Sequence, residues 1–360
     1  MPSKITARAP GRICLFGEHQ DFLGLAVIAC PIDLYITVKG TPRSDTEFHI
    51  EMPDVADSDR FEGANEVDYR YDLDFIRAAT NVVRRSGVNI ATGYDCLVHG
   101  DIPINAGTSS SSALVVAWVQ FLLASQDGQP LPSPEAVAHL AYEAEVPEFN
   151  APGGMMDHYT SAMGGLVYID CREPITVERL PARLEGLVLG NTGVRKDNNR
   201  ILAESRAATN TGFEILRQRL AGFDIRTTSL QEAEPYIAQM EPQVARRVRA
   251  NFINRDLCQQ ARRLLASEQF DPRRLGEMLY AHQVQLRDGI GVSHPKLDEL
   301  IETAMAAGAL GGKLNGSGGG GCMFAYAPGR QQQVKQAIEA AGGDAYLVSV
   351  SDGAHASIEQ

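Results

Sequence analysis

The chain has 360 residues, too many for one ordinary hydrophobic core, so two packed domains are expected. Apolar residues make up 44% and charged residues 22%, a composition typical of globular proteins, and the net charge of −12 disfavours nucleic acid and anionic membranes as partners. The N-terminus has no apolar segment of the signal-peptide type, and the six cysteines form no Cys-x-x-Cys pair. We therefore expect a cytoplasmic protein without nucleic-acid or membrane partners, and leave monomer or dimer open.

The first half of the chain reads mainly as strands followed by helices. The first forty residues alternate or run apolar, as strands do, whereas residues 41–74 are polar with weak periodicity and read as turns and short strands. Helix caps and apolar runs predict the elements that follow. In chain order these are helix 72–86, strand 94–98, a buried helix after the serines at 109–112, a helix from Ser133 that contains Glu145, a short helix at 155–157 and strand 166–169.

The second half is mainly helical and ends in a strand, a helix and a strand. Arginines cluster in one of its helices, but their spacing is typical of a solvated helix face. In chain order the predicted elements are strand 187–190, helices 198–220, 244–266, 273–288 and 295–307, strand 322–327, helix 330–341 and strand 345–350.

Polar side chains are concentrated in the segment PGRICLFGEHQDF between two apolar runs. Arg12, Glu18, His19 and Asp21 lie within ten residues of chain that must be largely buried. Buried polar groups are unfavourable unless they form hydrogen bonds, and a small polyhydroxylated ligand would provide them. A salt-bridged turn is the alternative interpretation of this cluster.

Two further segments suggest a site for phosphate. In PINAGTSSSSA, residues 103–113, hydroxyls and free N–H groups precede a buried helix, whose positive end attracts anions; an ordinary serine N-cap is the alternative. In LNGSGGGGCMF, residues 314–324, glycines permit positive φ and close approach of backbone to a ligand; a tight turn or linker is the alternative. A Walker A motif is absent, because Ala307 stands where its first glycine belongs and Leu314 follows Gly312-Lys313.

In this order, the three segments resemble the three motifs of the GHMP kinase superfamily, and they are most similar to its galactokinase branch. Residues 11–22 match G-R-x-N-L-x-G-E-H-x-D-Y, with Cys14 in place of Asn and Phe22 in place of Tyr, and residues 103–112 align without gaps with P-x-G-A-G-L-S-S-S-A. The similarity extends to Ala144-Glu145, 154–157, 191–199 and 281–300.

This resemblance implies an α/β (α+β) fold of two domains with the site in the cleft between them. Residues 1–185 would form a domain like the second domain of ribosomal protein S5. Residues 186–360 would form a ferredoxin-like domain that carries the glycine-rich loop 316–321. The implied activity is ATP- and Mg²⁺-dependent phosphorylation of the anomeric hydroxyl of an aldose.

The resemblance also implies roles for individual residues. Asp157 would face the anomeric hydroxyl as general base or orienting acceptor, and Arg12 would hold it ionised and offset phosphate charge. Glu145 and Ser111 would hold Mg²⁺, with Ser110 as a candidate for a further hydroxyl ligand. The sugar contacts would be Glu18, His19, Asp21 and Gly154, although His19 could equally stabilise the turn. The contacts to ATP would be Ala106, Gly107, Ser109, Ser110, Ser111, Gly316, Gly318 and Gly319.

Several departures from the family pattern bear on the substrate. Phe22 lacks a phenol, Leu23-Gly24-Leu25 replaces Asn-Gly-Gly, and Asn105 replaces a glycine of the serine loop. Galactose is the leading substrate, with arabinose, N-acetylgalactosamine or a uronic acid as alternatives. A mevalonate kinase-like enzyme is the second hypothesis, which Arg12 and Asp21 disfavour. A non-catalytic sensor of ATP and sugar is the third, which the intact serine loop, Glu145 and Asp157 disfavour.

Overall fold

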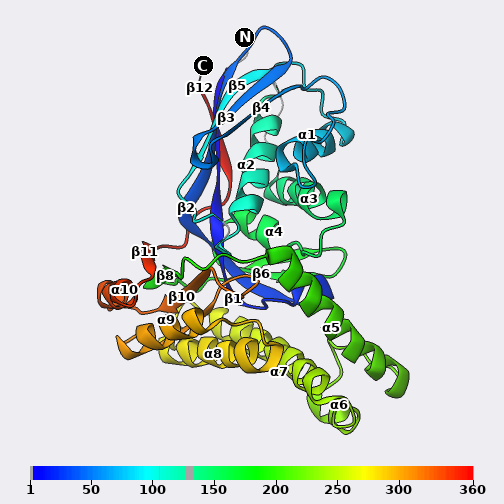
Figure 1. The fold of residues 1–360 in the computed structure, drawn as a ribbon, viewed down its shortest axis with the longest axis vertical. Coiled ribbons are helices and arrows are strands. Elements are labelled where there is room, and N and C mark those ends of the chain that lie inside the picture. Colours follow the sequence, from blue (N-terminus) through cyan, green and yellow to red (C-terminus); the bar gives the residue numbers. More distant parts are fainter. Residues whose placement is uncertain (1–2, 105, 127–132, 360) are drawn as a thin grey trace.

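The computed structural model describes residues 3–104, 106–126 and 133–359, so Asn105 lies outside the described residues. Figure 1 shows two packed domains, the arrangement that the length and the family resemblance predict. In the part of the chain that the structure describes, no helix has both the length and the apolar character needed to cross a membrane.

The N-terminal domain is built on a mixed sheet with the strand order β12-β1-β2-β5-β3-β4, to which β6 and β7 are added beside β2. Strand β3 pairs with β5 in parallel, and the other pairs are antiparallel. The apolar first forty residues form its two long strands, as predicted. The strands are β1 (Lys4–Phe16), β2 (Val27–Pro42), β3 (Glu47–Met52), β4 (Asp57–Glu62), β5 (Tyr94–Gly100), β6 (Val167–Asp170), β7 (Thr176–Arg179) and β12 (His355–Glu359).

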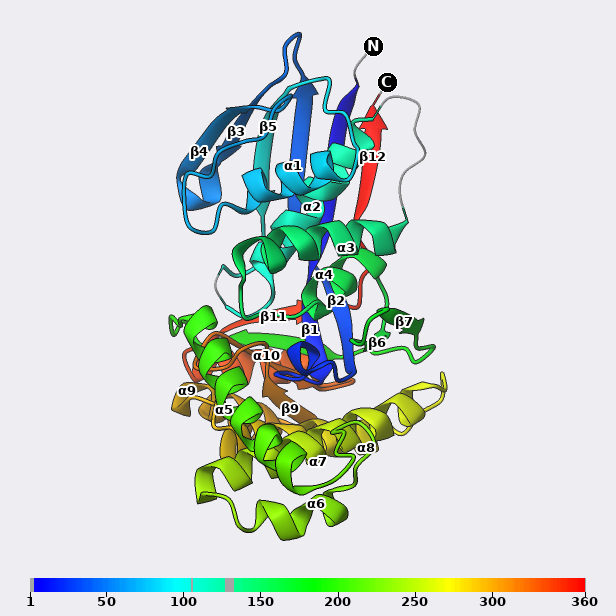
Figure 2. The ribbon, with the colours of Figure 1, turned by 90° about the vertical axis from the view of Figure 1, so that its right-hand side faces the viewer.

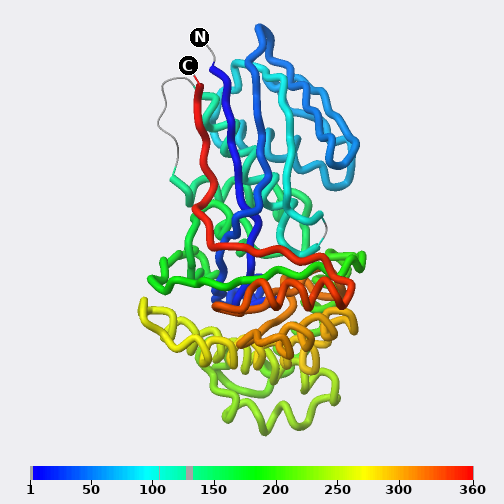
Figure 3. The backbone as a smooth tube through the Cα atoms, turned by 90° about the vertical axis from the view of Figure 1, so that its left-hand side faces the viewer, coloured from blue at the N-terminus to red at the C-terminus, as the bar shows by residue number. Residues whose placement is uncertain are grey.

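Helices cover one face of this sheet (Figure 2), and the opposite face consists of strands (Figure 3). The apolar helix after the serine run is buried on nearly all sides, as predicted, and its Trp118 Nε1 donates a hydrogen bond to Thr80 Oγ1 at 2.9 Å. The helices are α1 (Phe75–Arg85), α2 (Ser110–Ala124), α3 (Pro134–Glu145) and α4 (Met156–Met163), with 3-10 turns η1 (Asp21–Leu23), η2 (Pro53–Val55) and η3 (Pro147–Phe149).

The C-terminal domain contains an antiparallel sheet in the order β11-β8-β10-β9. In chain order these strands follow the βαββαβ pattern of a ferredoxin-like fold, which confirms the predicted fold. The glycine-rich segment connects the edge strand β9 to its neighbour in the sheet, the central strand β10. The strands are β8 (Leu187–Asn191), β9 (Gly311–Leu314), β10 (Cys322–Tyr326) and β11 (Asp344–Val348).

A large helical insertion separates β8 from β9. The predicted helices are present, but the helix expected at 273–288 ends earlier and continues as a π-helical segment, and the short helix α6 was not expected. The helices of the insertion are α5 (Asn198–Arg219), α6 (Leu230–Ile237), α7 (Pro242–Leu265), α8 (Pro272–Val284), the π-helical segment η4 (Gln285–Ile290) and α9 (Pro295–Ala306). The remaining helix of this domain, α10 (Gln331–Ala340), lies between β10 and β11.

The last strand, β12, does not belong to the domain in which the sequence places it, because residues 186–360 were all expected in the C-terminal domain. Strand β12 pairs antiparallel with β1, Ile358 opposite Ile5, so the end of the chain belongs to the N-terminal sheet. Figure 3 shows this return, with the end of the chain running beside its beginning. The physical reason is that the outer edge of β1 would otherwise expose unpaired backbone N–H and C=O groups.

An apolar core joins the domains directly beneath the polar segment 17–21. Ile13 and Phe16 of β1 pack with Leu189 of β8, Leu279 of α8 and Phe324 of β10 in one buried cluster. The first motif therefore leaves the N-terminal sheet at the point where both domains meet, which places its polar side chains at the cleft.

Candidate active site

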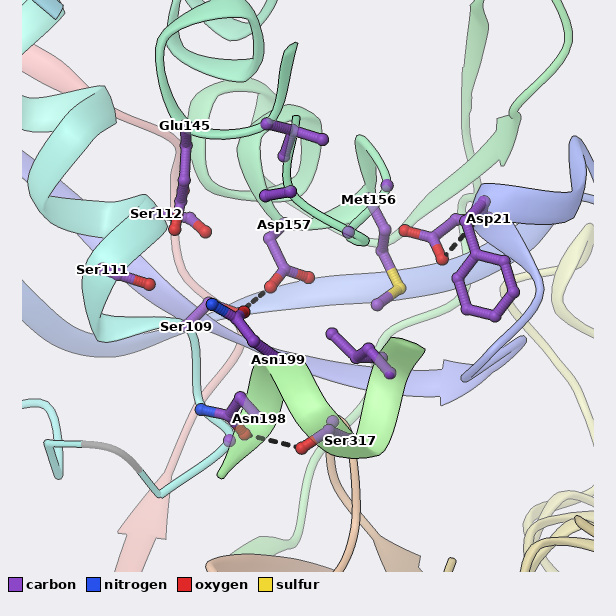
Figure 4. A pocket seen from close by; sticks show the side chains of 18 of the residues that line it. Asp21, Ser109, Ser111, Ser112, Glu145, Met156, Asp157, Asn198, Asn199 and Ser317 are labelled. Carbon is purple, nitrogen blue, oxygen red and sulfur yellow. Dashed lines mark hydrogen bonds between the residues drawn. The ribbon is translucent and has the colours of Figure 1, made fainter. Parts of the chain in front are cut away.

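A cavity of about 510 Å³ lies between the two domains. Elements far apart in the sequence supply its walls: the end of β1, the serine loop, the starts of α2, α4 and α5, and the loop between β9 and β10 (Figure 4). Most of the predicted site residues line it together. These are Arg12, Glu18, His19, Asp21, Gly107, Ser109, Ser110, Ser111, Glu145, Gly154, Asp157 and Gly316.

Asp157 is held by two partners from other parts of the chain. Arg12 donates from Nε to Oδ1 at 2.7 Å and from Nη2 to Oδ2 at 2.8 Å, while Ser109 Oγ donates to Oδ2 at 2.5 Å. Arg12 also donates from Nη1 to the carbonyl oxygen of Gly107 at 2.6 Å. The Arg12 side chain is 4% exposed, whereas that of Asp157 is 25% exposed and lines the cavity. Asp157 is therefore fixed on one side and open to a ligand on the other.

The charge state of this pair follows from its contacts. Burial raises the pKa of Asp157, but the positive charge and hydrogen bonds of Arg12 and the hydrogen bond of Ser109 outweigh burial, so the pKa lies below its ordinary value. Burial lowers the pKa of Arg12, and the Asp157 carboxylate more than compensates and raises it. A carboxylate with a lowered pKa stays ionised, so it can accept a hydrogen bond at pH 7, and it is a weak base.

The serine loop does not form an ordinary helix cap. Ser109 occupies the N-cap position of α2 with φ of 60°, and its side chain makes no capping hydrogen bond because its hydroxyl is used by Asp157. The N–H groups at the start of α2 consequently lack a side-chain cap, and Ser110, Ser111 and Ser112 line the cavity there. Such a helix end favours an anion.

Glu145, the last residue of α3, faces the cavity beside these serines (Figure 4). Its Oε2 lies 2.6 Å from Nε2 of the buried His158, and because a carboxylate only accepts, Nε2 carries the proton. Its Oε1 and the hydroxyl of Ser111 make no hydrogen bond with any described residue. One carboxylate oxygen and one hydroxyl in the same cavity are thus free, a donor set that suits Mg²⁺ completed by phosphate oxygens and water.

The opposite end of the cavity is formed by Asp21 and Gly154. The carboxylate of Asp21 lies so close to Gly154 that a Cβ on this glycine would be 2.1 Å from Oδ2. Burial and the charge of Asp157 raise the pKa of Asp21 to about 6, against the hydrogen bonds that it accepts from the backbone N–H groups of Phe22 and Met156.

His19 has φ of 63°, and its Nε2 lies 3.0 Å from the carbonyl oxygen of Ser317. Burial lowers the pKa of His19 to about 4, so the ring is neutral at pH 7, and its Nδ1 has no partner among the described residues. The ring therefore stabilises the turn against the glycine-rich loop and also lines the cavity.

The side chain of Glu18 is buried and is already bound to another residue of the protein. Its Oε1 accepts a hydrogen bond from the fully buried Lys313, which also donates to the carbonyl oxygens of Cys14 at 3.0 Å and Leu314 at 2.8 Å. Oε2 of Glu18 has no hydrogen-bond partner among the described residues, and His282 Nδ1 lies 3.9 Å away. Lys313 therefore ties the first motif to β9.

The glycine-rich loop meets the serine loop through backbone contacts. Cys322 N donates to the carbonyl oxygen of Ala106 at 2.5 Å, and a Cβ at Gly316 would lie 2.8 Å from the carbonyl oxygen of Gly107. Gly316 lines the cavity, but Gly318 and Gly319 pack against Val292 and Ile201 instead, and Ala106 is also buried away from it. These three predicted ATP contacts shape the loops without lining the cavity.

Sequence reasoning missed other residues that line the cavity. The end of segment 191–199, which resembles the family, contributes side chains to the cavity, and Asn198 Oδ1 accepts a hydrogen bond from Ser317 Oγ at 2.6 Å. The unusual density of polar residues in NTGVRKDNN was the available signal. The residues missed include His158, Lys196, Asp197, Asn198, Asn199 and Ser317.

Comparison with known protein families gives three matches along the chain. Residues 2–42 match the galactokinase galactose-binding signature, residues 74–165 the GHMP kinases N terminal domain, and residues 261–344 the GHMP kinases C terminal model.

Characterised relatives include both kinds of enzyme discussed above. The chain is 30% identical over 364 residues to a mevalonate kinase of Pyrococcus horikoshii, covering 98% of this chain and 97% of the relative. It is 30% identical over 336 residues to a galactokinase of Pasteurella multocida, covering 89% and 84%.

Solved structures support the same fold. A Lactococcus lactis galactokinase complexed with galactose superposes with a TM-score of 0.84 at 22% identity, covering 98% of this chain and 94% of that one. The Methanococcus jannaschii mevalonate kinase gives a TM-score of 0.73 at 16% identity, covering 96% and 98%.

Proposed function

Because this chain belongs to the GHMP kinases, which transfer a phosphoryl group from ATP to an alcohol, we propose that it phosphorylates the anomeric hydroxyl of an aldose, with galactose as the leading substrate. The observation that carries this proposal is the convergence of Arg12, Ser109 and Asp157 in one cavity that also contains Asp21 and Gly154. A phosphate-binding end and a hydroxyl-binding end then face each other across Asp157.

In the mechanism that we propose, most of the catalysis comes from holding the two substrates in the correct relative position. Phosphoryl transfer requires the attacking oxygen, phosphorus and leaving oxygen in line, with little covalent work from the protein. The uncapped start of α2 and Arg12 would bind phosphate oxygens, and Asp157 would accept a hydrogen bond from the sugar hydroxyl. Since the pKa of Asp157 is lowered, we infer that it orients the hydroxyl first and receives its proton late in the transfer.

The donor set at the start of α2 fits a bound Mg²⁺. Glu145 Oε1 and the Ser111 hydroxyl would hold the ion, and His158 would keep the Glu145 carboxylate turned toward it. The ion would supply positive charge to the phosphate oxygens.

We assign sugar selection to the end of the cavity formed by Asp21 and Gly154, away from the start of α2. Asp21 can accept from two neighbouring hydroxyls, and the absence of a Cβ at Gly154 lets the carboxylate lie flat against the backbone. The match of residues 2–42 to the galactokinase galactose-binding signature covers this end and supports galactose.

A mevalonate kinase-like activity is the second candidate. It is favoured by relatives that align over nearly their full length, and by Arg206. Arg206 lies over the ring of Phe22, 5.8 Å from its centroid, and forms no ion pair with a carboxylate of the described residues. It lines a side pocket of about 290 Å³ that opens beside Asp21 and Gly154. A cation there suits mevalonate or a uronic acid, both of which carry a carboxylate.

One assay distinguishes these candidates. ADP release would be measured with ATP and Mg²⁺ over galactose, arabinose, N-acetylgalactosamine, galacturonic acid and mevalonate, and the product bond located by phosphorus NMR. We expect turnover with an aldose and phosphate on the anomeric carbon. Turnover with mevalonate alone would overturn the proposal, and binding of ATP and sugar without any ADP release would indicate a sensor. If a carboxylate substrate is used, Arg206→Ala should raise its KM about tenfold or more and leave the KM of galactose unchanged.

A further inference from the structure

Lys196 is a lysine whose buried Nζ has no partner among the described residues. It lies between β8 and α5, lines the cavity between the domains, and its Nζ makes no hydrogen bond to any described residue. No carboxylate lies within ion-pair distance of it in the described parts of the chain. An unpaired buried ammonium group destabilises a folded protein. Its presence therefore indicates that the missing anion is a ligand.

The position of Lys196 identifies which ligand that is. A Cβ at Gly107 of the serine loop would lie 2.8 Å from Lys196 Nζ, and a Cβ at Gly321 of the glycine-rich loop would lie 2.9 Å from its Cε. The side chain therefore passes between the two loops at a point where both lack side chains. Lys196 lines the same cavity as Ser109, Asp157 and Gly316, with its Nζ buried at the wall.

No described residue forms an ion pair with Lys196. The carboxylate of Asp157 is already held by two hydrogen bonds from Arg12 and one from Ser109. The pKa of Lys196 is lowered to about 8, mainly by burial and also by the charge of Arg12, against the opposing effects of Cys322 and Asp157. The amine still carries its proton at pH 7, and an anion beside it would stabilise that charged form.

We propose that Lys196 is a catalytic residue whose ammonium group binds the γ-phosphate of ATP. This inference rests on the proposed kinase function. In the transfer, the bond from the acceptor oxygen to phosphorus forms, the bond from phosphorus to the β–γ bridging oxygen breaks, and its electron pair leaves with ADP. The acceptor proton goes to Asp157. Lys196 keeps its proton and, together with Arg12, neutralises charge on the oxygens of the transferred group.

The test compares nucleotide binding, turnover and stability of Lys196→Met with those of the wild-type protein. Calorimetry with ATP, ADP and AMP at saturating Mg²⁺ needs no acceptor, so it does not depend on which alcohol is phosphorylated. We expect Lys196→Met to lose at least about tenfold of the preference for ATP over ADP, to bind AMP normally, and to lower kcat about a hundredfold or more.

The melting temperature distinguishes a ligand-binding role of Lys196 from a structural one, because the two roles predict changes of opposite sign in Lys196→Met. Removing an unpaired buried charge while keeping the length of the side chain should raise the melting temperature of the ligand-free protein. Lys196→Arg should retain more of the ATP preference than Lys196→Met. Lys39→Met, the same change at an exposed strand position outside the cavity, should alter none of these quantities.

Two results would overturn the inference in distinguishable ways. In the first, the wild-type protein prefers ATP and Lys196→Met keeps that preference, together with either a near-normal kcat or a lower melting temperature. Lys196 then does not bind the γ-phosphate, although the kinase function stands. If the wild-type protein binds no adenine nucleotide, the proposed function fails together with the inference.

Discussion

The carboxylate of Asp21 lies directly against the backbone of Gly154, with Oδ2 only 2.1 Å from the place where a Cβ would stand. This contact joins the first motif to the segment that carries Asp157, three residues further on. No side chain can be added at Gly154 without moving the carboxylate, because a contact below 3 Å between a carbon and an oxygen is strongly repulsive.

Gly154→Ala should therefore act on the sugar and leave the nucleotide unaffected. We expect the KM of the sugar to rise about tenfold or more, because displaced Asp21 no longer matches two hydroxyls, and ATP affinity to stay within about twofold. Steady-state kinetics with each substrate varied in turn measures both. Gly153→Ala, where the nearest atom to a Cβ would be 3.5 Å away, is the matched control. Equal effects on both KM values would contradict the assignment of this end of the cavity.

Asp157→Ala should lower kcat about a hundredfold or more, since the acceptor hydroxyl loses the group that orients it and receives its proton. The change also leaves the guanidinium of Arg12 buried without its carboxylate, so the melting temperature should fall. Asp157→Asn keeps the shape and should separate the two effects, with low kcat but a smaller loss of stability. Near-normal turnover by a folded variant would rule out this role.

The raised pKa of Asp21 predicts a pH dependence of sugar binding. Burial and the charge of Asp157 raise this pKa to about 6, so below that pH the side chain is protonated and accepts hydrogen bonds less well. The KM of the sugar should rise as pH falls through about 6, and Asp21→Asn should remove this dependence. A KM of the wild-type protein that stays constant between pH 5 and 8 would contradict it.

The carboxyl group of Asp21 also makes the free energy of unfolding depend on pH. Because the pKa of Asp21 in the folded protein lies above its ordinary value of 3.8, the native state binds more protons than the unfolded state between about pH 4 and 6. Its contribution to the free energy of unfolding therefore decreases as pH rises through that window. Asp21→Asn should raise the melting temperature at pH 7 and change it little at pH 4, which calorimetry can measure.

Glu145→Gln should raise the Mg²⁺ concentration needed for half-maximal activity about tenfold or more, because a neutral amide is a weaker ligand than a carboxylate. His158→Phe should shift the same titration in the same direction and by less, since it removes only the hydrogen bond that orients Glu145. Glu143→Gln, on the same helix but outside the cavity, is the control. An unchanged Mg²⁺ titration in Glu145→Gln would move the metal elsewhere.

Local patterns in the sequence were sufficient for most of the fold. The apolar alternation of the first forty residues gave β1 and β2, and the apolar run after the serines gave the buried helix α2. The order of the three motifs identified the family because each motif is a short, contiguous segment. Helix α6 was missed because its eight residues include Pro235, which local propensity interprets as a helix breaker.

The sequence by itself determined which loops would carry the chemistry, because glycine, serine and charged residues at fixed spacing specify local backbone and available donors. Only the tertiary structure decided how those groups are used. Ser109 binds Asp157 instead of capping its helix, Glu18 pairs with a lysine 295 residues away, and β12 returns to the first strand. Lys196 has no partner in the described part of the chain for the same reason: burial and the partners of a charge are set by segments that meet only when the chain has folded.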